Sequence, residues 1–446
     1  MQSSSRGACL SQLLRLANSR SQLAELLPGP PVISLSQQGF CAKADSHASG
    51  PLAGIKVLDL GQVVAGNFAG GLLAYFGADV IKVEPPGAGD ALRSLRMADA
   101  TGTSLWWRTY GRNRRCMTLD LRKDAARDIV KQLSSQADAL IENFRPGVME
   151  KWGLGPKDLH EELIYARISG YGQTGPKAHL PGYASVCEAY SGFRHINGFP
   201  DRPPVRPNIS LGDSLAGLHA AFGVVMALFH RQRQSGRAGG QVIDAAITES
   251  VFNMLEGCIP EYVAHGHDRP PSGSTISGVV PSSCFATKDG KWAIIGGNGE
   301  SVYTRLMAAV GRPDMGAQNP TYATNSKRCE VEDVIYQVIG DWVKQRTLSE
   351  VLAAMAEARV PSGPIMSIAD LYNDQQFQQR SMFQTARPPG GEDEVTIPAM
   401  LPVMSETPGS TRWAGPELGH HTNEILTNEL GYSQEHIDQL REEGVI

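Results

Sequence analysis

Asp213 is the residue of this 446-residue chain whose type and position point most directly to chemistry. It lies between Gly212 and Ser214, where a turn gives way to an apolar segment with helical spacing. A carboxylate there can cap the helix by accepting orphan backbone N–H bonds, or it can act as a nucleophile presented to a ligand. An unperturbed aspartate is ionised at pH 7 without a general base, so both interpretations remain open on spacing alone.

Two loops supply further candidates for ligand binding. Asn143, Phe144 and Arg145 directly follow a predicted strand, and ligands bind at the carboxyl ends of strands in α/β sheets. Phe144 can stack on an aromatic base or can simply pack against its neighbours. The glycine-rich segment 296–299 is consistent with a mobile loop close to a ligand or with a plain β-turn.

Arginines gather at two places. Arg112, Arg114 and Arg115 lie within four residues, which suits phosphate groups or a solvated run of charge. Arg206 lies in a Pro-Val-Arg-Pro loop ahead of Asp213. It can grip a carboxylate through two hydrogen bonds or form a structural ion pair.

The helix behind Asp213 must hold it in place. Its large apolar residues recur near helical spacing and predict a face that is buried: Leu215, Leu218, Phe222, Val225 and Phe229.

The elements that precede this helix predict a parallel sheet. A strand at 55–60, a Gly/Ala-rich helix at 61–76 and a strand at 80–84 form a βαβ unit. Further strands are predicted at 117–121, 139–142, 163–169 and 241–245, with helices at 124–136, 184–191 and 246–265. No G-x-G-x-x-G follows the first strand, so the dinucleotide fingerprint is not met. From 266 to 374 the pattern changes to a hairpin and several helices, which indicates a second, smaller domain.

Composition excludes several classes of protein. A net charge of −5 gives no nucleic-acid footprint, and no uninterrupted apolar run reaches the length of a membrane span. The seven cysteines form no CxxC pair or Cys/His cluster, which suits free thiols and predicts no metal site. The adjacent His420 and His421 are interpreted as a solvated turn.

Residues 1–45 differ from the rest of the chain. They are rich in arginine and serine and poor in acids, which is typical of a transit peptide. A disordered tail or an error in the gene sequence is the alternative.

Several segments, in this order and spacing from about residue 54 onward, resemble the family III CoA-transferases, the CaiB/BaiF type. They include Ile81-Lys82-Val83-Glu84, Asn143-Phe144-Arg145-Pro146-Gly147, Gly170-Tyr171-Gly172-Gln173-Thr174-Gly175-Pro176, Pro181-Gly182-Tyr183, Gly212-Asp213 and Gly415-Pro416-Glu417-Leu418-Gly419.

The resemblance implies an α/β fold. Its large doubly wound parallel-sheet domain is built from both chain ends, 50–265 and 375–446, and its smaller α+β domain spans 266–374. Two subunits are expected to form an interlocked dimer.

The resemblance also implies roles for individual residues. Asp213 matches the nucleophile, which forms a mixed anhydride and then an aspartyl-CoA thioester. The residues that match CoA contacts are Val64, Ala65, Leu119, Arg122, Asn143, Phe144, Arg145, Lys151 and Tyr183. Gly296, Gly297, Asn298 and Gly299 match a loop that closes over the intermediate. Some members place a phosphate-binding arginine where this chain has Pro85-Pro86, so that contact is expected elsewhere or not at all.

The nearest competing function is that of the α-methylacyl-CoA racemases, which share this fold. Their catalytic histidine has no counterpart in Pro181-Gly182-Tyr183-Ala184, which disfavours racemisation. A catalytically silent CoA-binding protein is a third possibility. Within the family, the overall resemblance is to the succinyl-CoA:glutarate CoA-transferases. We therefore expect a mitochondrial matrix enzyme that passes CoA from succinyl-CoA to a dicarboxylate, uses the CoA thioester as co-substrate and needs no permanently bound cofactor. Its partners are expected to be small molecules and a second copy of the chain, not nucleic acid or membrane.

Overall fold

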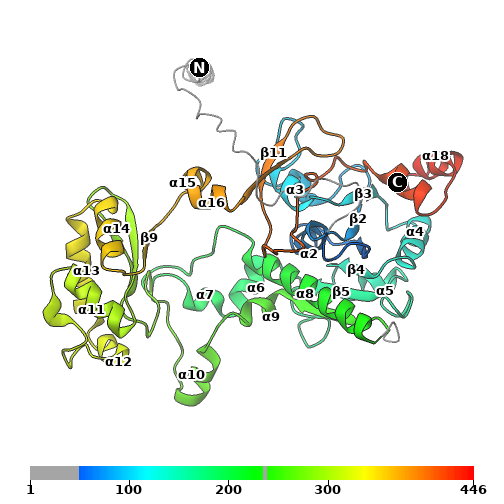
Figure 1. The fold of residues 1–446 in the computed structure, drawn as a ribbon. Helices are drawn as coiled ribbons and strands as arrows, with labels where there is room; N and C mark the ends of the chain where they lie inside the picture. The colour runs from blue at the N-terminus through cyan, green and yellow to red at the C-terminus, as the bar shows by residue number, and fades with distance from the viewer. Residues whose placement is uncertain (1–49, 235–238) are drawn as a thin grey trace, which may run out of the picture. The chain divides into compact units, whose positions relative to one another are not determined.

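A six-stranded parallel sheet forms the centre of the larger part of the protein (Figure 1). The structure is a computed structural model that describes residues 50–234 and 239–446. The strand order is β3-β2-β1-β4-β5-β6, so the chain starts in the middle, moves outward to β3 and then crosses to the other half. This confirms the predicted α/β fold with a doubly wound parallel sheet. The predicted transit peptide lies outside the described residues.

The strands of this sheet are β1 (Lys56–Asp59), β2 (Asp79–Glu84), β3 (Arg115–Thr118), β4 (Ala139–Glu142), β5 (Ile164–Ser169) and β6 (Val242–Ala246). The helices of the same part are α2 (Ala65–Tyr75), α3 (Leu105–Tyr110), α4 (Asp124–Ser134), α5 (Val148–Lys151), α6 (Ala184–Tyr190), α7 (Phe193–Ile196), α8 (Leu211–Arg233), α9 (Ile247–Phe252), α10 (Cys258–His265), α17 (Thr422–Asn428) and α18 (Gln434–Glu442), with a 3₁₀ turn at Ala91–Ser94.

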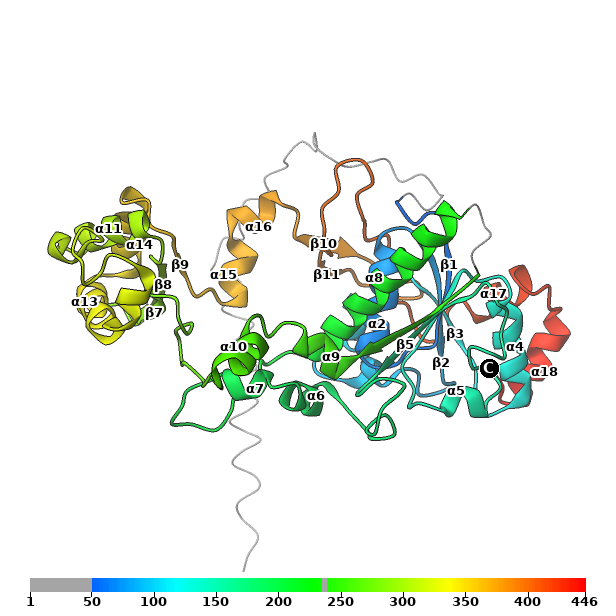
Figure 2. The same ribbon diagram turned by 90° about the horizontal axis from the view of Figure 1, so that it is seen from below.

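Each face of the sheet has its own hydrophobic core, because neighbouring residues of a strand point to opposite faces. In β1, Val57 belongs to a core with Ala69 of α2 and Ala220 of α8. Leu58 belongs to a core on the other face, with Ile129 of α4 and Leu440 of α18. Figure 2 shows α2 and α8 on one side of the sheet and α4, α17 and α18 on the other. The C-terminal helices therefore help to cover one face of the sheet whose first strand comes from the N-terminal segment.

Residues 280–364 contain a second sheet, with helices and a hydrophobic core of its own. The sheet is antiparallel and consists of β7 (Ser282–Ala286), β8 (Trp292–Gly296) and β9 (Ser362–Pro364). Four helices, α11 (Glu300–Ala309), α12 (Asn325–Cys329), α13 (Glu332–Lys344) and α14 (Leu348–Glu357), accompany a 3₁₀ turn at Pro313–Met315. The core of this segment contains only residues between Val280 and Val360. The domain limits of 266–374 stay a prediction.

Two short helices and a hairpin lead back to the C-terminal segment. They are α15 (Ile368–Asn373), α16 (Gln375–Gln379) and the antiparallel pair β10 (Phe383–Ala386) and β11 (Val395–Pro398).

The predicted buried face of α8 is wrong. Leu218, Phe222, Val225, Met226 and Phe229 are 38–59% exposed in the single chain. The buried face consists instead of small residues: Gly212, Ala216, Gly217, Ala220, Ala221, Gly223, Val224 and Ala227.

Close backbone approach explains this choice of small residues. A Cβ added to Gly217 would lie 2.5 Å from the carbonyl oxygen of Ala65 in α2, and one added to Gly223 would lie 2.8 Å from Ile243. Among the described helices, α8 alone is long and apolar enough to cross a membrane by length and composition. Its contacts with α2 and β5 are those of a core helix.

Most element boundaries differ from the predictions by one or two residues, and three differences concern how an element begins or is divided. The segment 246–265 forms two helices, because residues 253–257 leave the helical path and Glu256 has a φ of 50°. The helix predicted from Gly61 begins only at Ala65, and β3 starts two residues before its predicted position.

Candidate functional site

A cavity of about 290 Å³ opens at the carboxyl ends of β1, β4 and β5. Its walls come from the loops after these strands, from the turn before α6 and from the starts of α8 and α9. The lining residues are Gln62, Val63, Val64, Ala65, Asn143, Phe144, Arg145, Pro146, Ile168, Ser169, Gly170, Leu180, Pro181, Gly182, Tyr183, Asp213 and Ile247. Seven of the predicted site residues are thereby brought together: Val64, Ala65, Asn143, Phe144, Arg145, Tyr183 and Asp213.

Asp213 is not the N-cap of its helix. α8 begins at Leu211 after Ser210, so Asp213 is the third helical residue. No side chain caps this helix start, and Asp213 is the acidic residue of its first turn. The carboxylate is therefore available to the cavity that it lines.

The pKa of Asp213 differs from that of a free aspartate. Burial, followed by the nearby Glu188 carboxylate, raises it to about 6, and Arg206 opposes the shift. The assumption of an unperturbed carboxylate was therefore wrong, although a group with this pKa is still mostly ionised at pH 7. The positive end of a helix stabilises an anion, but here burial outweighs that effect.

Arg206 forms an ion pair with Glu188, with 3.3 Å between Nε and Oε2. Arg206 is absent from the cavity lining, so its role in gripping a substrate carboxylate stays a prediction.

The wall formed by the β1–α2 loop contains a strained residue. Val63 has a φ of 62°, a left-handed conformation that is an outlier for a β-branched residue. Its N–H donates to the buried carboxylate of Asp90 at 2.9 Å, and its carbonyl accepts from Asn67 at 2.7 Å. Lys82, also fully buried, lies 3.2 Å from Asp90 and donates to the carbonyl of Gly61. This buried polar cluster holds the loop in its strained shape.

The loop after β4 is tied to the same wall. The Asn143 side chain accepts from the N–H of Gln62 at 2.7 Å and donates to its carbonyl at 2.8 Å. The Phe144 ring makes an edge contact with Trp152, with 5.1 Å between centroids. Phe144 therefore has a packing partner, while it also lines the cavity.

The other predicted CoA contacts lie outside this cavity. Leu119 is buried in the core shared with α4 and α18. Arg122 is exposed and pairs with Asp120, and Lys151 ends α5. Their contacts with CoA stay predictions.

The segment 296–299 does not line the cavity either. Gly296 ends β8 and Gly299 precedes α11. The N–H groups of Gly296 and Gly297 donate to the carbonyls of Pro361 and Pro281, at 3.0 and 2.9 Å. These two donors are therefore engaged in the structure and are not free to stabilise an oxyanion.

The arginine run at 112–115 is neither a solvated charge run nor a free phosphate site. Arg112 and Arg114 are fully buried. Arg114 donates to Asp59 at 2.5 Å and to Asn67 at 2.7 Å, while Arg115 pairs with Asp79. Each guanidinium is engaged in holding the fold together. Arg93, which follows Pro85-Pro86, is likewise committed to Glu84, at 2.7 Å.

The histidine pair also differs from its interpretation as a solvated turn. His421 is 8% exposed, and its Nδ1 accepts from the N–H of Cys116 at 3.1 Å. Burial lowers its pKa to about 4. Within residues 50–234 and 239–446, no group of three or more His, Cys, Asp or Glu residues is placed to hold a metal ion.

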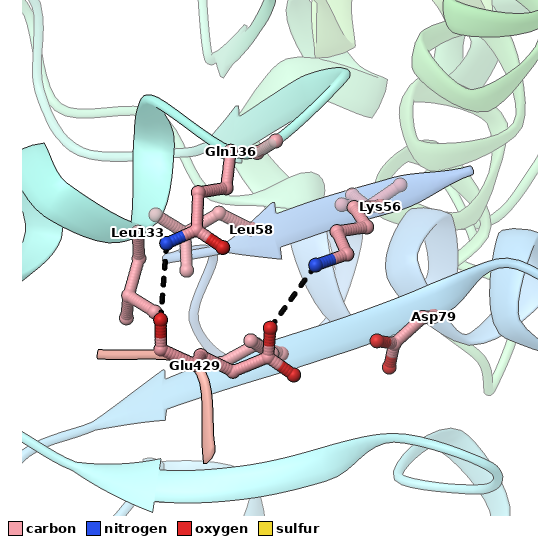
Figure 3. Close-up of a pocket in the computed structure, with 9 residues that line it drawn as sticks. Lys56, Leu58, Asp79, Leu133, Gln136 and Glu429 are labelled. Atoms are coloured by element: carbon pink, nitrogen blue, oxygen red, sulfur yellow. Dashed lines mark hydrogen bonds and ion pairs between the residues drawn. The ribbon is translucent and has the colours of Figure 1, made fainter. Parts of the chain in front are cut away.

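A second cavity, shown in Figure 3, has only about 20 Å³, which is room for a single water. Lys56 and Glu429 pair across it at 3.0 Å, and Gln136 donates to the carbonyl of Glu429 at 3.1 Å. These contacts tie the C-terminal segment to β1, so we assign this cavity no chemistry.

Two residues that line the cavity, and one that contacts the start of α8, were missed from the sequence. Ser169 and Gly170 stand where β5 ends, and the rule that ligands bind at carboxyl ends of strands would have found them. Glu188 had a weaker signal, as the sole acid in a short helix of small and apolar residues.

Fold and site together define an α/β protein with a carboxylate in a cavity at the carboxyl edge of a parallel sheet. A model of CoA-transferase family III matches residues 52–422, and the chain belongs to this family. It is an enzyme, a CoA-transferase that uses a CoA thioester as co-substrate.

Known proteins that match most of the chain support this assignment. The chain is 42% identical to succinyl-CoA–D-citramalate CoA-transferase of Chloroflexus aurantiacus over 399 residues, 89% of this chain and 98% of the relative. It is 30% identical to human succinyl-CoA:glutarate CoA-transferase over 407 residues, 91% and 92% of the two chains. The crystal structure of a CaiB/BaiF family protein from Brucella suis superposes with a TM-score of 0.74 at 30% identity, covering 85% of this chain and 100% of that one.

Proposed function

We propose that the enzyme transfers CoA from succinyl-CoA to a second dicarboxylic acid, with glutarate as the first candidate acceptor, through covalent intermediates on Asp213. The observation that carries this proposal is the position of Asp213 in the cavity, among the loops after three strands. The relatives' names add support, since both name succinyl-CoA as donor and a five-carbon dicarboxylate as acceptor.

The chemistry proceeds in two symmetrical halves. A carboxylate oxygen of Asp213 attacks the thioester carbonyl, so that a C–O bond forms, the C–S bond breaks and CoA leaves as a thiolate. The thiolate attacks the Asp213 carbonyl of the mixed anhydride, which releases succinate and leaves an aspartyl-CoA thioester. The acceptor carboxylate then attacks this thioester, which forms a second mixed anhydride and releases the CoA thiolate. The thiolate attacks the acceptor's acyl carbon, so that the acceptor's CoA thioester forms and the Asp213 carboxylate is restored. One difficult exchange is thereby divided into easier steps.

A screen of acceptors with succinyl-CoA tests the proposal. The panel is glutarate, D-citramalate, L-malate, 3-hydroxy-3-methylglutarate, itaconate, oxalate and carnitine, with acyl-CoA products identified by mass spectrometry. We expect five-carbon dicarboxylates to be used best and carnitine not at all. Transfer to carnitine alone, or no transfer to any acid, would overturn the proposal. Deuterium exchange at the α-carbon of a branched acyl-CoA, without transfer, would support the racemase alternative.

We also propose that the enzyme is a homodimer. The apolar stripe on α8, made of Leu218, Phe222, Val225, Met226 and Phe229, is exposed in the single chain, and large exposed apolar patches mark contact surfaces. A second copy of the chain is the partner that the family resemblance favours.

Replacement of Phe222 by glutamate is expected to weaken the dimer strongly, because it places a charge in a desolvated contact. Sedimentation velocity over a concentration series measures the effect. The matched control is Val334→Glu, at an exposed valine of a different helix, α13. An unchanged dissociation constant in Phe222→Glu, or a monomeric wild type, would contradict the proposal.

A mitochondrial matrix location also remains a proposal. It rests on the composition of residues 1–45, and a fluorescent fusion carrying these residues tests it.

A further inference from the structure

A second carboxylate, that of Glu188, lies close enough to Asp213 to affect its pKa. Glu188 of α6 has no solvent exposure, and both of its oxygens have partners. The N–H of Gly212 donates to Oε1 at 3.1 Å, and Nε of Arg206 donates to Oε2 at 3.3 Å. Gly212 precedes Asp213 in the first turn of α8, so Glu188 is bonded to the backbone that carries the candidate nucleophile.

This turn has little freedom to move. A Cβ added to Gly212 would lie 3.0 Å from Ile247, 3.2 Å from Val251 and 3.3 Å from the side chain of Glu188. Side chains of α6 and α9 therefore crowd the position that a Cβ of this residue would occupy. Because this packing is close, we expect a change at Glu188 to be felt at the backbone of Gly212 and Asp213.

The same groups determine the charge around Asp213. Glu188 acts to raise the pKa of the Asp213 carboxyl and Arg206 acts to lower it. Burial raises the pKa of the Cys187 thiol of α6, and the nearby Asp213 carboxylate adds to this shift. Of the residues that line the cavity, only Arg145 and Tyr183 carry other titratable side chains. Glu188 and Arg206 thus form an ion pair whose two charges have opposite effects on the pKa of Asp213.

We propose that Glu188 is a positioning residue for Asp213, which it holds in place through its hydrogen bond with the N–H of Gly212. A more basic carboxylate is a better nucleophile toward a thioester, provided that it remains ionised. Glu188 makes the Asp213 carboxylate more basic, and Arg206 helps to keep it ionised. This inference rests on the proposed role of Asp213 in the transfer reaction.

The test uses the exchange of labelled succinate into succinyl-CoA, which requires no acceptor to be known. In Glu188→Gln, which keeps the side-chain length and an acceptor for Gly212, the acid limb of kcat/KM is expected to move down by about one pH unit. The rate on the plateau is expected to fall several-fold, since the carboxylate is less basic. In Arg206→Gln the acid limb is expected to move upward. Glu249→Gln, at an exposed glutamate of α9, is the matched control and should leave the profile unchanged.

A purely structural role gives a different result. Lower activity in Glu188→Gln with an unmoved acid limb, or movement in the same direction in both variants, would overturn the inference.

A second measurement does not depend on activity. The change in melting temperature that Asp213→Asn causes is measured over a range of pH, once in the wild type and once in Glu188→Gln. This change depends on pH because Asp213 ionises and asparagine does not. We expect a smaller effect in the Glu188→Gln background, and an equal effect would contradict the proposal. If the wild type exchanges no succinate, the proposed function fails, while this measurement still decides the role of Glu188.

Discussion

The substitution Asp213→Asn is expected to abolish CoA transfer and leave CoA binding intact. The amide has nearly the shape of the carboxylate, so the cavity walls are kept, but it cannot form the anhydride. Loss of a covalent nucleophile costs on the order of 10⁴-fold or more in turnover. Succinate exchange into succinyl-CoA measures the loss, and calorimetry with CoA measures the binding.

The control for this variant is Asp201→Asn, an exposed aspartate in the loop ahead of α8. It should retain the wild-type rate. Mass spectrometry must confirm that the introduced amide has not deamidated, since a trace of aspartate would restore activity. Hydroxylamine trapping mapped to residue 213 in the wild type is the positive counterpart. Turnover close to wild type in Asp213→Asn would exclude the covalent route.

The same substitution is expected to stabilise the protein at neutral pH. The pKa of Asp213 is raised in the folded state to about 6, so folding favours the protonated carboxyl. Stability from this group is full below the unfolded pKa near 3.8 and declines as the pH rises through about 6. Asp213→Asn should therefore gain about 1–3 kcal/mol at pH 7–8 and nothing near pH 4. Denaturant unfolding at the two pH values checks both the size and the sign.

The largest loss of stability is expected from Asp90→Ala. Its carboxylate accepts from the N–H groups of Val63 and Leu92, both at 2.9 Å, and from Asn67 at 2.6 Å. Lys82 lies 3.2 Å away, and neither charged side chain is exposed. Removal of one partner of a buried pair leaves an uncompensated charge and costs about 3–5 kcal/mol. Denaturant unfolding measures the free energy change, and kcat/KM should fall with it because the strained loop at Val63 loses its support.

A variant of an exposed ion pair shows whether the loss of stability in Asp90→Ala comes from the buried site or would follow the removal of any aspartate. Asp128→Ala breaks an exposed pair with Lys131 and should change stability by less than about 1 kcal/mol. The double variant Asp90→Ala, Lys82→Met should recover part of the loss, because no buried charge is then left alone. A loss in Asp90→Ala no greater than in Asp128→Ala would contradict the role assigned to the cluster.

The sequence predicted the sheet well because its strands are short apolar runs bounded by turns, as in Ala139–Glu142, whose bounds were correct. It also predicted that the loop after this strand is a place for ligand binding, and Asn143 does line the cavity. Val64 lines the same cavity, but it was predicted to lie within a helix and was connected with CoA only by the family resemblance. These features depend on local pattern and on the rule for parallel sheets.

Features that depend on tertiary packing were not predictable in the same way. The face that α8 buries was reversed, because contact with α2 requires glycine and alanine and leaves the larger residues outside. Arg114 could not be recognised as buried, since its partner Asp59 lies 55 residues away in the chain. The influence of Glu188 on Asp213 likewise arises only when α6 and α8 meet.

The glycine of α8 that contacts α2 also fixes how closely the helix that carries Asp213 approaches α2. Gly217 lies one turn after Asp213, and its α-carbon faces the carbonyl of Ala65, where the opposite wall begins. The separation of the two helices here is thus a spacing between two backbones, which no side-chain rotation can adjust. A bulkier residue at position 217 would act as a wedge between the helices. We expect the width of the cavity and the position of Asp213 to change together in such a variant.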